Sequence, residues 1–207
     1  MSQQPTPAEK RKFICSLQKR HPGFRIAVGQ DARFTCSQRG ERSEFRSGFD
    51  TFFQVLRLMW VSDAFAVQVS YRLRTALMRR GIPFFPRMLH RHAMRSAQIT
   101  IGPGVYIHPG VYFVHGQRVV DGLVEIRTRV VLSPWVTVGL RAGNVQGPTI
   151  EPDVNIGTGA KIIGPVTIGS ESLIGANAVV VDDIPAGMTA VGMPAKVVGR
   201  SPLVTEE

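Results

Sequence analysis

The sequence predicts a mainly β protein in which an α-helical N-terminal region precedes a parallel β-helix. Three observations predict it. An aliphatic residue returns every six positions through the C-terminal half, a second small or aliphatic residue follows each of these after four positions, and glycines cluster beside them. A strand repeats every two residues and a helix every 3.6, so a period of six over this length indicates a coil of short strands. Stacking of such coils buries the apolar rows that no single coil can bury.

The uninterrupted row of aliphatic residues consists of Ile150, Ile156, Ile162, Ile168, Ile174 and Val180. The positions four residues further on are Val154, Ala160, Val166, Ser172, Ala178 and Ile184. Glycine follows several members of the first row, as at Gly157 and Gly169, and we expect it to form the sharp corners between strands because it has no Cβ. The same spacing recurs upstream from Ile101 to Phe113 and from Ile126 to Val138, so the coil is predicted to begin near Thr100.

The chain divides into four predicted parts. Residues 1–48 are expected to be a tail and an irregular basic segment, and residues 49–99 an α-helical domain. Residues 100–200 form the β-helix domain, and residues 201–207 are a second tail.

A single long helix is predicted between Phe49 and Met78, where apolar residues recur every three to four positions. Asp50 is placed to cap its start. Pro83 and Pro86 are expected to break it. Charged residues inside this segment make it unsuitable as a transmembrane span.

The net charge of +10 belongs to the N-terminal half, because residues 1–100 carry +12 and residues 101–207 carry −2. Three interpretations are open. The helical domain could pack its apolar stripe on the coil or on a sister subunit and keep its arginines solvated, or residues 49–95 could contact an anionic membrane surface. Nucleic-acid binding is the third, but no recognised motif accompanies the charge, so we expect no such partner.

Cysteine usage and the N-terminus favour a cytoplasmic protein, placed at the inner face of the membrane if the basic region contacts lipid. Cys15 and Cys36 form no disulfide framework, and the first fifteen residues lack the apolar stretch of a signal peptide. A metal-dependent hydratase on the same coil would need three converging histidines. The coil contains only His108 and His115, so we expect no metal.

Four stretches resemble the hexapeptide-repeat acyltransferases and, within that family, the serine acetyltransferase-like branch. They are YRLRTALMRRGIPFFPRMLHR before the coil, ITIGPGVYIHPGVYFVHG at its start, IGTGAKIIGPVTIGSESLIGANAVVVDDIP in its middle and VGMPAKVVG at its end. The resemblance covers most of the chain from Tyr71 onward. It implies a left-handed coil, a homotrimer or a dimer of trimers, and direct transfer of an acetyl group from acetyl-CoA to an alcohol.

Such a transfer needs a general base that removes the hydroxyl proton as the carbon–oxygen bond forms. The resemblance places the family's catalytic histidine on His115. His108 lies one repeat out of register with the family motif and is the alternative. Asp121 or Glu125 is a candidate to orient His115, although a backbone carbonyl can do the same.

The resemblance also implies where acetyl-CoA, the expected co-substrate, binds. The pantetheine arm would lie along a groove of the coil beside the small residues Gly139, Ala160 and Ala178. Lys196 and Arg200 would contact the nucleotide phosphates. The alternative for these two cations is that they are ordinary surface charges after the last coil.

The expected acceptor follows from three departures from the family pattern. The family's orienting aspartate aligns with Thr100, an aspartate that holds the serine amine aligns with Val114, and an Arg-His pair aligns with Gln146-Gly147. A free amino acid needs opposite charges for both of its charged groups. We therefore expect a hydroxyl of a sugar or glycan as acceptor, with serine as the alternative and a non-catalytic trimeric scaffold as another. Residues 140–148 interrupt the hexads and are expected to form a loop that walls the acceptor site.

Overall fold

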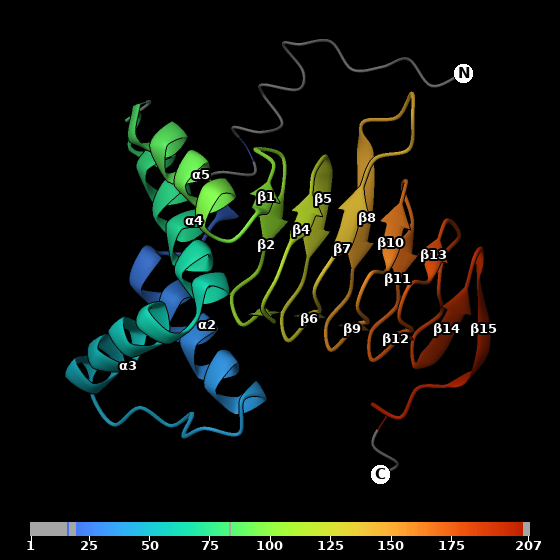
Figure 1. Cartoon of the computed structure of the whole chain (residues 1–207), viewed down its shortest axis with the longest axis horizontal. Helices are drawn as coiled ribbons and strands as arrows, with labels where there is room; N and C mark the ends of the chain where they lie inside the picture. The colour runs from blue at the N-terminus through green and yellow to red at the C-terminus, as the bar shows by residue number, and fades with distance from the viewer. Residues whose placement is uncertain (1–15, 17–19, 83, 205–207) are drawn as a thin grey trace.

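The computed structural model describes residues 16, 20–82 and 84–204. A group of helices lies across one end of a long coil of short strands (Figure 1). The predicted combination of a helical N-terminal region and a parallel β-helix is therefore confirmed. Within the described ranges, no helix has the length and apolar character that crossing a bilayer requires.

The coil has three faces, each a sheet whose neighbouring strands come from successive turns. The first sheet consists of β1 (Ile99–Ile101), β4 (Arg118–Val120), β7 (Val136–Gly139), β10 (Lys161–Ile163) and β13 (Val179–Val180). The second consists of β2 (Tyr106–Ile107), β5 (Leu123–Ile126), β8 (Gln146–Ile150) and β11 (Thr167–Ile168). The third consists of β3 (Tyr112–Phe113), β6 (Val131–Leu132), β9 (Asn155–Ile156), β12 (Leu173–Ile174), β14 (Met188–Gly192) and β15 (Ala195–Arg200).

The register of the strands explains the period of six. On the first sheet Ile162 pairs with Val180, and on the third Ile156 pairs with Ile174, so a partner returns after three hexads. The whole aliphatic row from Ile150 to Val180 is at most 1% exposed. All pairings are parallel apart from the last, in which β15 runs antiparallel to β14.

Two corner glycines are needed because the next coil leaves no room for a Cβ atom, and neither has an unusual backbone angle. A Cβ on Gly157 would lie 2.7 Å from the nitrogen of Ala176, and one on Gly169 would lie 2.3 Å from the nitrogen of Ala186. Real side chains do not approach backbone atoms so closely. The glycines therefore allow successive coils to stack in contact.

The predicted single helix is two helices, α3 (Gly48–Val61) and α4 (Asp63–Arg79). Ser62 separates them in an extended conformation, and its hydroxyl oxygen accepts a hydrogen bond from the Phe65 nitrogen at 3.3 Å. The prediction of one helix was wrong because the apolar spacing continues across this cap. The sequence pattern alone does not show the change of direction.

The segment expected to be irregular contains a further helix, α2 (Phe24–Gln38). Its buried face is made of small and polar residues together with one valine, namely Ala27, Val28, Gly29, Asp31, Ala32, Thr35 and Cys36. Such a face gives little apolar periodicity. The prediction of an irregular segment was wrong for this reason.

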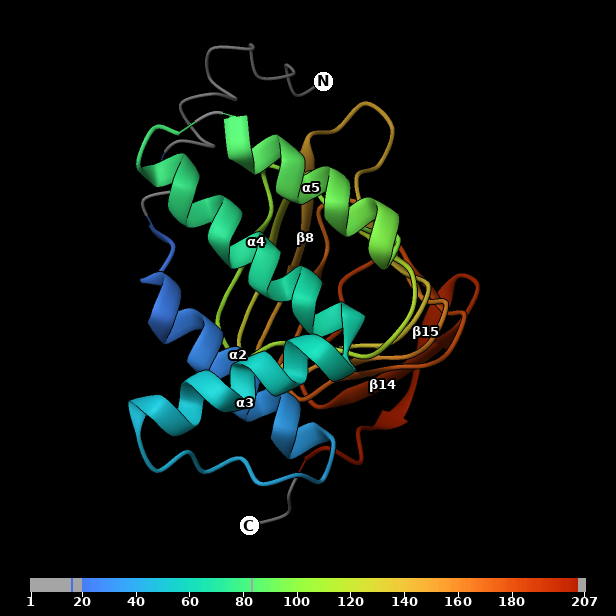
Figure 2. The ribbon, with the colours of Figure 1, turned by 60° about the vertical axis from the view of Figure 1, so that its left-hand side comes forward.

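The predicted break follows α4, which ends at Arg79, and a further helix, α5 (Phe84–Ser96), comes after it; Pro83 lies outside the described residues. Pro86 lies in the first turn of α5, where a missing N–H costs no helical hydrogen bond. Figure 2 shows α5 and α4 side by side across the end of the coil, with α2 and α3 beyond them.

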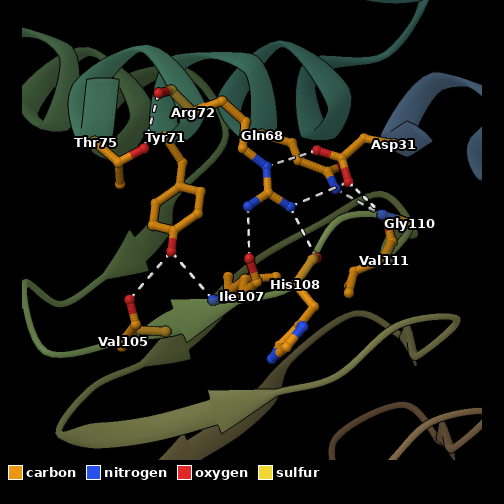
Figure 3. A network of polar contacts seen from close by, with 10 residues as sticks. All are labelled: Asp31, Gln68, Tyr71, Arg72, Thr75, Val105, Ile107, His108, Gly110 and Val111. Atoms are coloured by element: carbon orange, nitrogen blue, oxygen red, sulfur yellow. Dashed lines mark hydrogen bonds and ion pairs between the residues drawn. The ribbon is translucent and has the colours of Figure 1, made fainter. Parts of the chain in front are cut away.

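Side chains of α4 contact the first coil through a buried polar network (Figure 3). The Nε of Arg72 donates to Asp31 Oδ2 at 2.8 Å, and its Nη1 and Nη2 donate to the carbonyl oxygens of Ile107 at 2.6 Å and His108 at 2.9 Å. Asp31 Oδ1 accepts from the Gly110 nitrogen at 2.8 Å. Arg72 and Asp31 are 2% and 1% exposed, so part of the basic charge that could have faced solvent or lipid is structural.

Three more residues of α4 donate to first-coil carbonyls. Arg74 donates to Ile101 at 2.9 Å, Tyr71 to Val105 at 3.1 Å and Gln68 to Val111 at 2.8 Å.

Helix α3 exposes an aromatic face in the single chain, formed by Phe49, Phe52, Phe53 and Trp60.

Candidate active site

His115 lies at the corner where the chain passes from the third sheet to the first. The later corners of the same kind stack on it along the coil axis: Gly159 donates to the carbonyl oxygen of Pro134 at 2.9 Å, and Asn177 donates to that of Thr158 at 2.8 Å. The imidazole of His115 is exposed. His115 therefore lies at the end of the coil nearest the helical region, at the start of a continuous row of stacked corners. We call this row, from His115 through Gly159 to Asn177, the corner row.

A cleft of about 370 Å³ opens between His115 and the helical region. The helical region contributes Arg39, residues 61–64 and residues 96–98, and the coil contributes residues 112–113 and 115–117. An exposed histidine in such a cleft can reach a small hydroxyl compound from one side. This is the arrangement that a general base requires.

A buried arginine holds the backbone of His115 from inside the coil. Arg118 is 1% exposed, and its Nη2 donates to the carbonyl oxygen of Val114 at 2.7 Å and, more weakly, to those of Leu132 at 3.3 Å and His115 at 3.4 Å. Burial lowers the pKa of Arg118 to about 10, which still leaves it protonated at neutral pH. Arg118 was not predicted from the sequence, although a charged residue at an inward position, two before the aliphatic Val120, was the available signal.

Asp121 lies at the following corner, between the first and second sheets. It lines a different cleft, together with Pro103 and Leu123, and that cleft shares no residue with the one that contains His115. Within one chain Asp121 therefore does not orient His115. The role assigned to it stays a prediction that requires a second subunit.

The carboxylate–histidine pair of the structure involves Glu125 and His108 instead. Their Oε1 and Nε2 atoms are 2.9 Å apart, and Arg20 lies 3.2 Å from the same oxygen. Burial would raise the pKa of Glu125, but the hydrogen bond with His108 and the charges of Arg20 and Arg127 outweigh it and lower that pKa. Glu125 thus pairs with His108 beside the second sheet and does not line the cleft of His115.

The residues predicted to bind acetyl-CoA fall into two groups. Ala160 and Ala178 belong to the corner row, with their methyl groups fully buried in the core. Lys196 and Arg200 lie exposed on β15 at the far end of the coil, and the 3.9 Å contact between Lys196 and Asp182 is too exposed to hold either side chain firmly. Gly139 ends β7 on the opposite side of the first sheet and is apart from the row.

The positions that depart from the family pattern carry no charge in the structure either. Thr100 pairs with Val119 on the first sheet, Val114 precedes His115, and Gln146 begins β8. The turn between β7 and β8 lies at the corner of Asp121, so in one chain this loop does not wall the cleft of His115.

Two other features bear on the choice of site. A cleft of about 610 Å³ between α4, α5 and β1 is larger, but its lining is mostly apolar and its histidine, His90, faces Arg74 at 3.2 Å. Among the described residues, no three His, Cys, Asp or Glu side chains gather as metal ligands would. The cleft that contains His115 is the candidate active site.

The chain resembles known proteins in sequence and in fold. The family described as "Bacterial transferase hexapeptide (six repeats)" matches residues 147–182. A serine acetyltransferase of Helicobacter pylori is 41% identical over 136 residues, which are 64% of this chain and 79% of that protein. The chain belongs to the serine acetyltransferase family. It is accordingly an acetyl-CoA-dependent O-acetyltransferase that acts on a small-molecule acceptor.

Other serine acetyltransferases match at lower sequence identity. That of Mycobacterium tuberculosis is 38% identical over 136 residues, which are 64% of this chain and 59% of the relative. The soybean serine acetyltransferase complexed with serine has a TM-score of 0.71 at 28% identity and covers 87% of this chain and 71% of its own. The enzyme of Brucella abortus has a TM-score of 0.74 at 23% identity, with 94% and 76% coverage, and supports the fold.

Proposed function

We propose that the enzyme transfers the acetyl group of acetyl-CoA to the hydroxyl of L-serine, with His115 as the general base. The observation that carries the proposal is an exposed histidine in a cleft at the start of the coil, in a chain 41% identical to a serine acetyltransferase. This acceptor replaces the sugar or glycan that the sequence departures favoured.

The proposed chemistry is a direct displacement. The imidazole of His115 takes the hydroxyl proton while the oxygen attacks the thioester carbonyl, so that a carbon–oxygen bond forms and the carbon–sulfur bond breaks. The proton then passes to the departing CoA thiolate. General-base assistance of this kind contributes roughly 100- to 10,000-fold to the rate.

Acetyl-CoA would approach His115 along the corner row. We propose that its pantetheine arm passes the corners of Ala160 and Ala178, and that Lys196 and Arg200 bind its phosphates. CoA at 100 times its dissociation constant would then stabilise the folded protein by about 2.7 kcal/mol. We expect K196A and R200A to weaken this shift in melting temperature.

A sugar or glycan hydroxyl is the second candidate acceptor. It is favoured by the neutral side chains of Thr100, Val114 and Gln146, because a neutral acceptor needs no charged partners. L-serine and a sugar acceptor would use the same general base and the same co-substrate. They differ only in the chemical groups that surround the reacting hydroxyl and must fit the cleft.

The test is thiol release from acetyl-CoA with L-serine and a panel of sugars and glycan fragments. We expect turnover with L-serine and a loss of roughly 100- to 10,000-fold in kcat for H115A. The exposed His92 gives the matched control, because H92A removes the same ring without touching the cleft. Turnover with sugars alone would select the second candidate, and unchanged turnover of H115A would remove His115 from the base role.

The assembly is also a proposal. We propose a cytoplasmic homotrimer, in which Asp121 and the turn between β7 and β8 of a neighbouring subunit would approach the cleft of His115. Sedimentation equilibrium at several concentrations measures the oligomeric state. A protein that stays monomeric while it turns over substrate would contradict the trimer.

A further inference from the structure

An amino-acid acceptor creates an electrostatic requirement that the coil does not meet. Its ammonium and carboxylate would both leave water in the cleft, and each then needs a partner of opposite charge. The positions where the family resemblance would put such partners hold Thr100, Val114, Gln146 and Gly147. If serine is the acceptor, its charged partners must come from another part of the chain.

Asp63 supplies a carboxylate to the cleft from the helical region. It is the first residue of α4, it is exposed, and it lines the same cleft as His115. Among the contacts of the described residues, its carboxylate makes no side-chain hydrogen bond or ion pair, whereas Glu41 and Asp50 are both held by arginines. The helix dipole stabilises an acidic residue in the first turn of a helix. This interaction does not use a hydrogen bond of the carboxylate, so both oxygens of Asp63 can still bind a ligand.

Arg39 supplies a guanidinium to the same cleft from the end of α2. Its Nε donates to Glu41 Oε1 at 2.8 Å, and this hydrogen bond raises the pKa of Arg39. The contact occupies one of the three guanidinium nitrogens. Among the described residues no hydrogen bond involves the two terminal nitrogens of Arg39, so they can bind a planar carboxylate, which arginine binds in a bidentate manner.

We propose that Asp63 binds the ammonium and Arg39 the carboxylate of the amino-acid acceptor, and so set the specificity for L-serine. The inference rests on the proposed function and names the residues that would select its substrate. The cleft of about 370 Å³ is large enough to hold such a molecule with its hydroxyl toward His115. The three groups come from α2, α4 and the coil, so the helical region takes part in substrate recognition.

Three small hydroxyl compounds separate the two contacts. L-serine carries both charged groups, ethanolamine carries only the ammonium, and 3-hydroxypropionate carries only the carboxylate. We expect D63N to raise KM about 10- to 100-fold for L-serine and ethanolamine and to leave 3-hydroxypropionate unchanged, because the negative charge that strengthens the hydrogen bond to the ammonium is lost. R39Q should raise KM by a similar factor for L-serine and 3-hydroxypropionate and leave ethanolamine unchanged.

E41Q is the matched control for Arg39. It weakens the same ion pair but keeps the guanidinium in the cleft, so a purely structural role of that pair would give E41Q and R39Q the same defect. We expect E41Q to keep KM for L-serine within about threefold of the wild type. Melting temperatures of all three variants report whether they fold.

The outcomes distinguish this inference from the proposed function. If the wild type acetylates L-serine and both D63N and R39Q keep its KM and its preference among the three compounds, the assignment of these residues is wrong and serine stands. If the wild type acetylates only sugars, the serine proposal fails and the charged contacts fail with it. If calorimetry detects L-serine binding to the wild type and equally to D63N, the contact with Asp63 is excluded without any need for turnover.

Discussion

Replacement of Asp31 by asparagine should strongly destabilise the protein. The change keeps the shape of the side chain but removes the charge that faces Arg72, and both residues are at most 2% exposed. Removal of one partner of a buried ion pair leaves an uncompensated charge and typically costs about 3–5 kcal/mol. For a chain of this size, where 1 kcal/mol corresponds to about 2–4 °C, the melting temperature should fall by roughly 6–20 °C.

The exposed pair of Arg129 and Asp153 provides the matched control. Both carboxylate oxygens of Asp153 lie 2.6 Å from the guanidinium, but the two side chains are 57% and 33% exposed. D153N should therefore cost at most about 1 kcal/mol. Asparagine also tolerates the left-handed backbone at this position, where φ is 63°.

The assay is equilibrium unfolding in urea, followed by circular dichroism, for the wild type, D31N, D153N and the double variant D31N/R72M. The double variant removes the unpaired charge and should recover part of the stability lost in D31N. A loss of less than about 1 kcal/mol in D31N, or equal losses in D31N and D153N, would refute the argument that burial makes the first pair important.

Three further predictions concern other parts of the molecule. Burial, with the nearby arginines, lowers the pKa of His21 to about 4, so the unfolded state binds the proton of this histidine more tightly than the folded state does. The free energy of unfolding should therefore fall by about 3 kcal/mol as the pH drops from 6.5 to 4. H21Q should flatten that part of the pH profile of unfolding. G169A should lose about 1–3 kcal/mol because its methyl group meets the next coil, whereas G199A, with open space around it, should stay within about 0.5 kcal/mol of the wild type in the same urea titration. S62A should lose about 1 kcal/mol through the missing cap of α4, and an unchanged melting temperature would count against the cap.

The coil could be predicted from the sequence because its burial follows a strict spacing. Each turn repeats the same inward positions on its three faces, so a row such as Ile150 to Val180 identifies faces, corners and stacking together. The helical region could not be predicted equally well. The buried face of α2 contains Asp31, which pairs with the distant Arg72, and Thr35, and both residues resemble solvent-facing positions in the sequence.

The candidate site was predictable only in part for a related reason. His115 stands in a recognisable stretch of the coil. Arg39 and Asp63 reach the same cleft from two helices, more than fifty positions earlier in the chain. No local pattern connects these residues, because only the packing of α2 and α4 against the coil brings them together. Asp121, the candidate to orient His115, lies at another corner.

The side chains of α4 also determine where the stack of coils stops. The first turn of a β-helix has a row of unpaired backbone groups along each face, and such an edge can recruit strands from another molecule. Arg72, Arg74, Tyr71 and Gln68 donate hydrogen bonds to carbonyl oxygens on this edge and so take the place of a preceding strand. At the other end β15 folds back against β14. Removal of the helices would therefore expose a template for end-to-end aggregation.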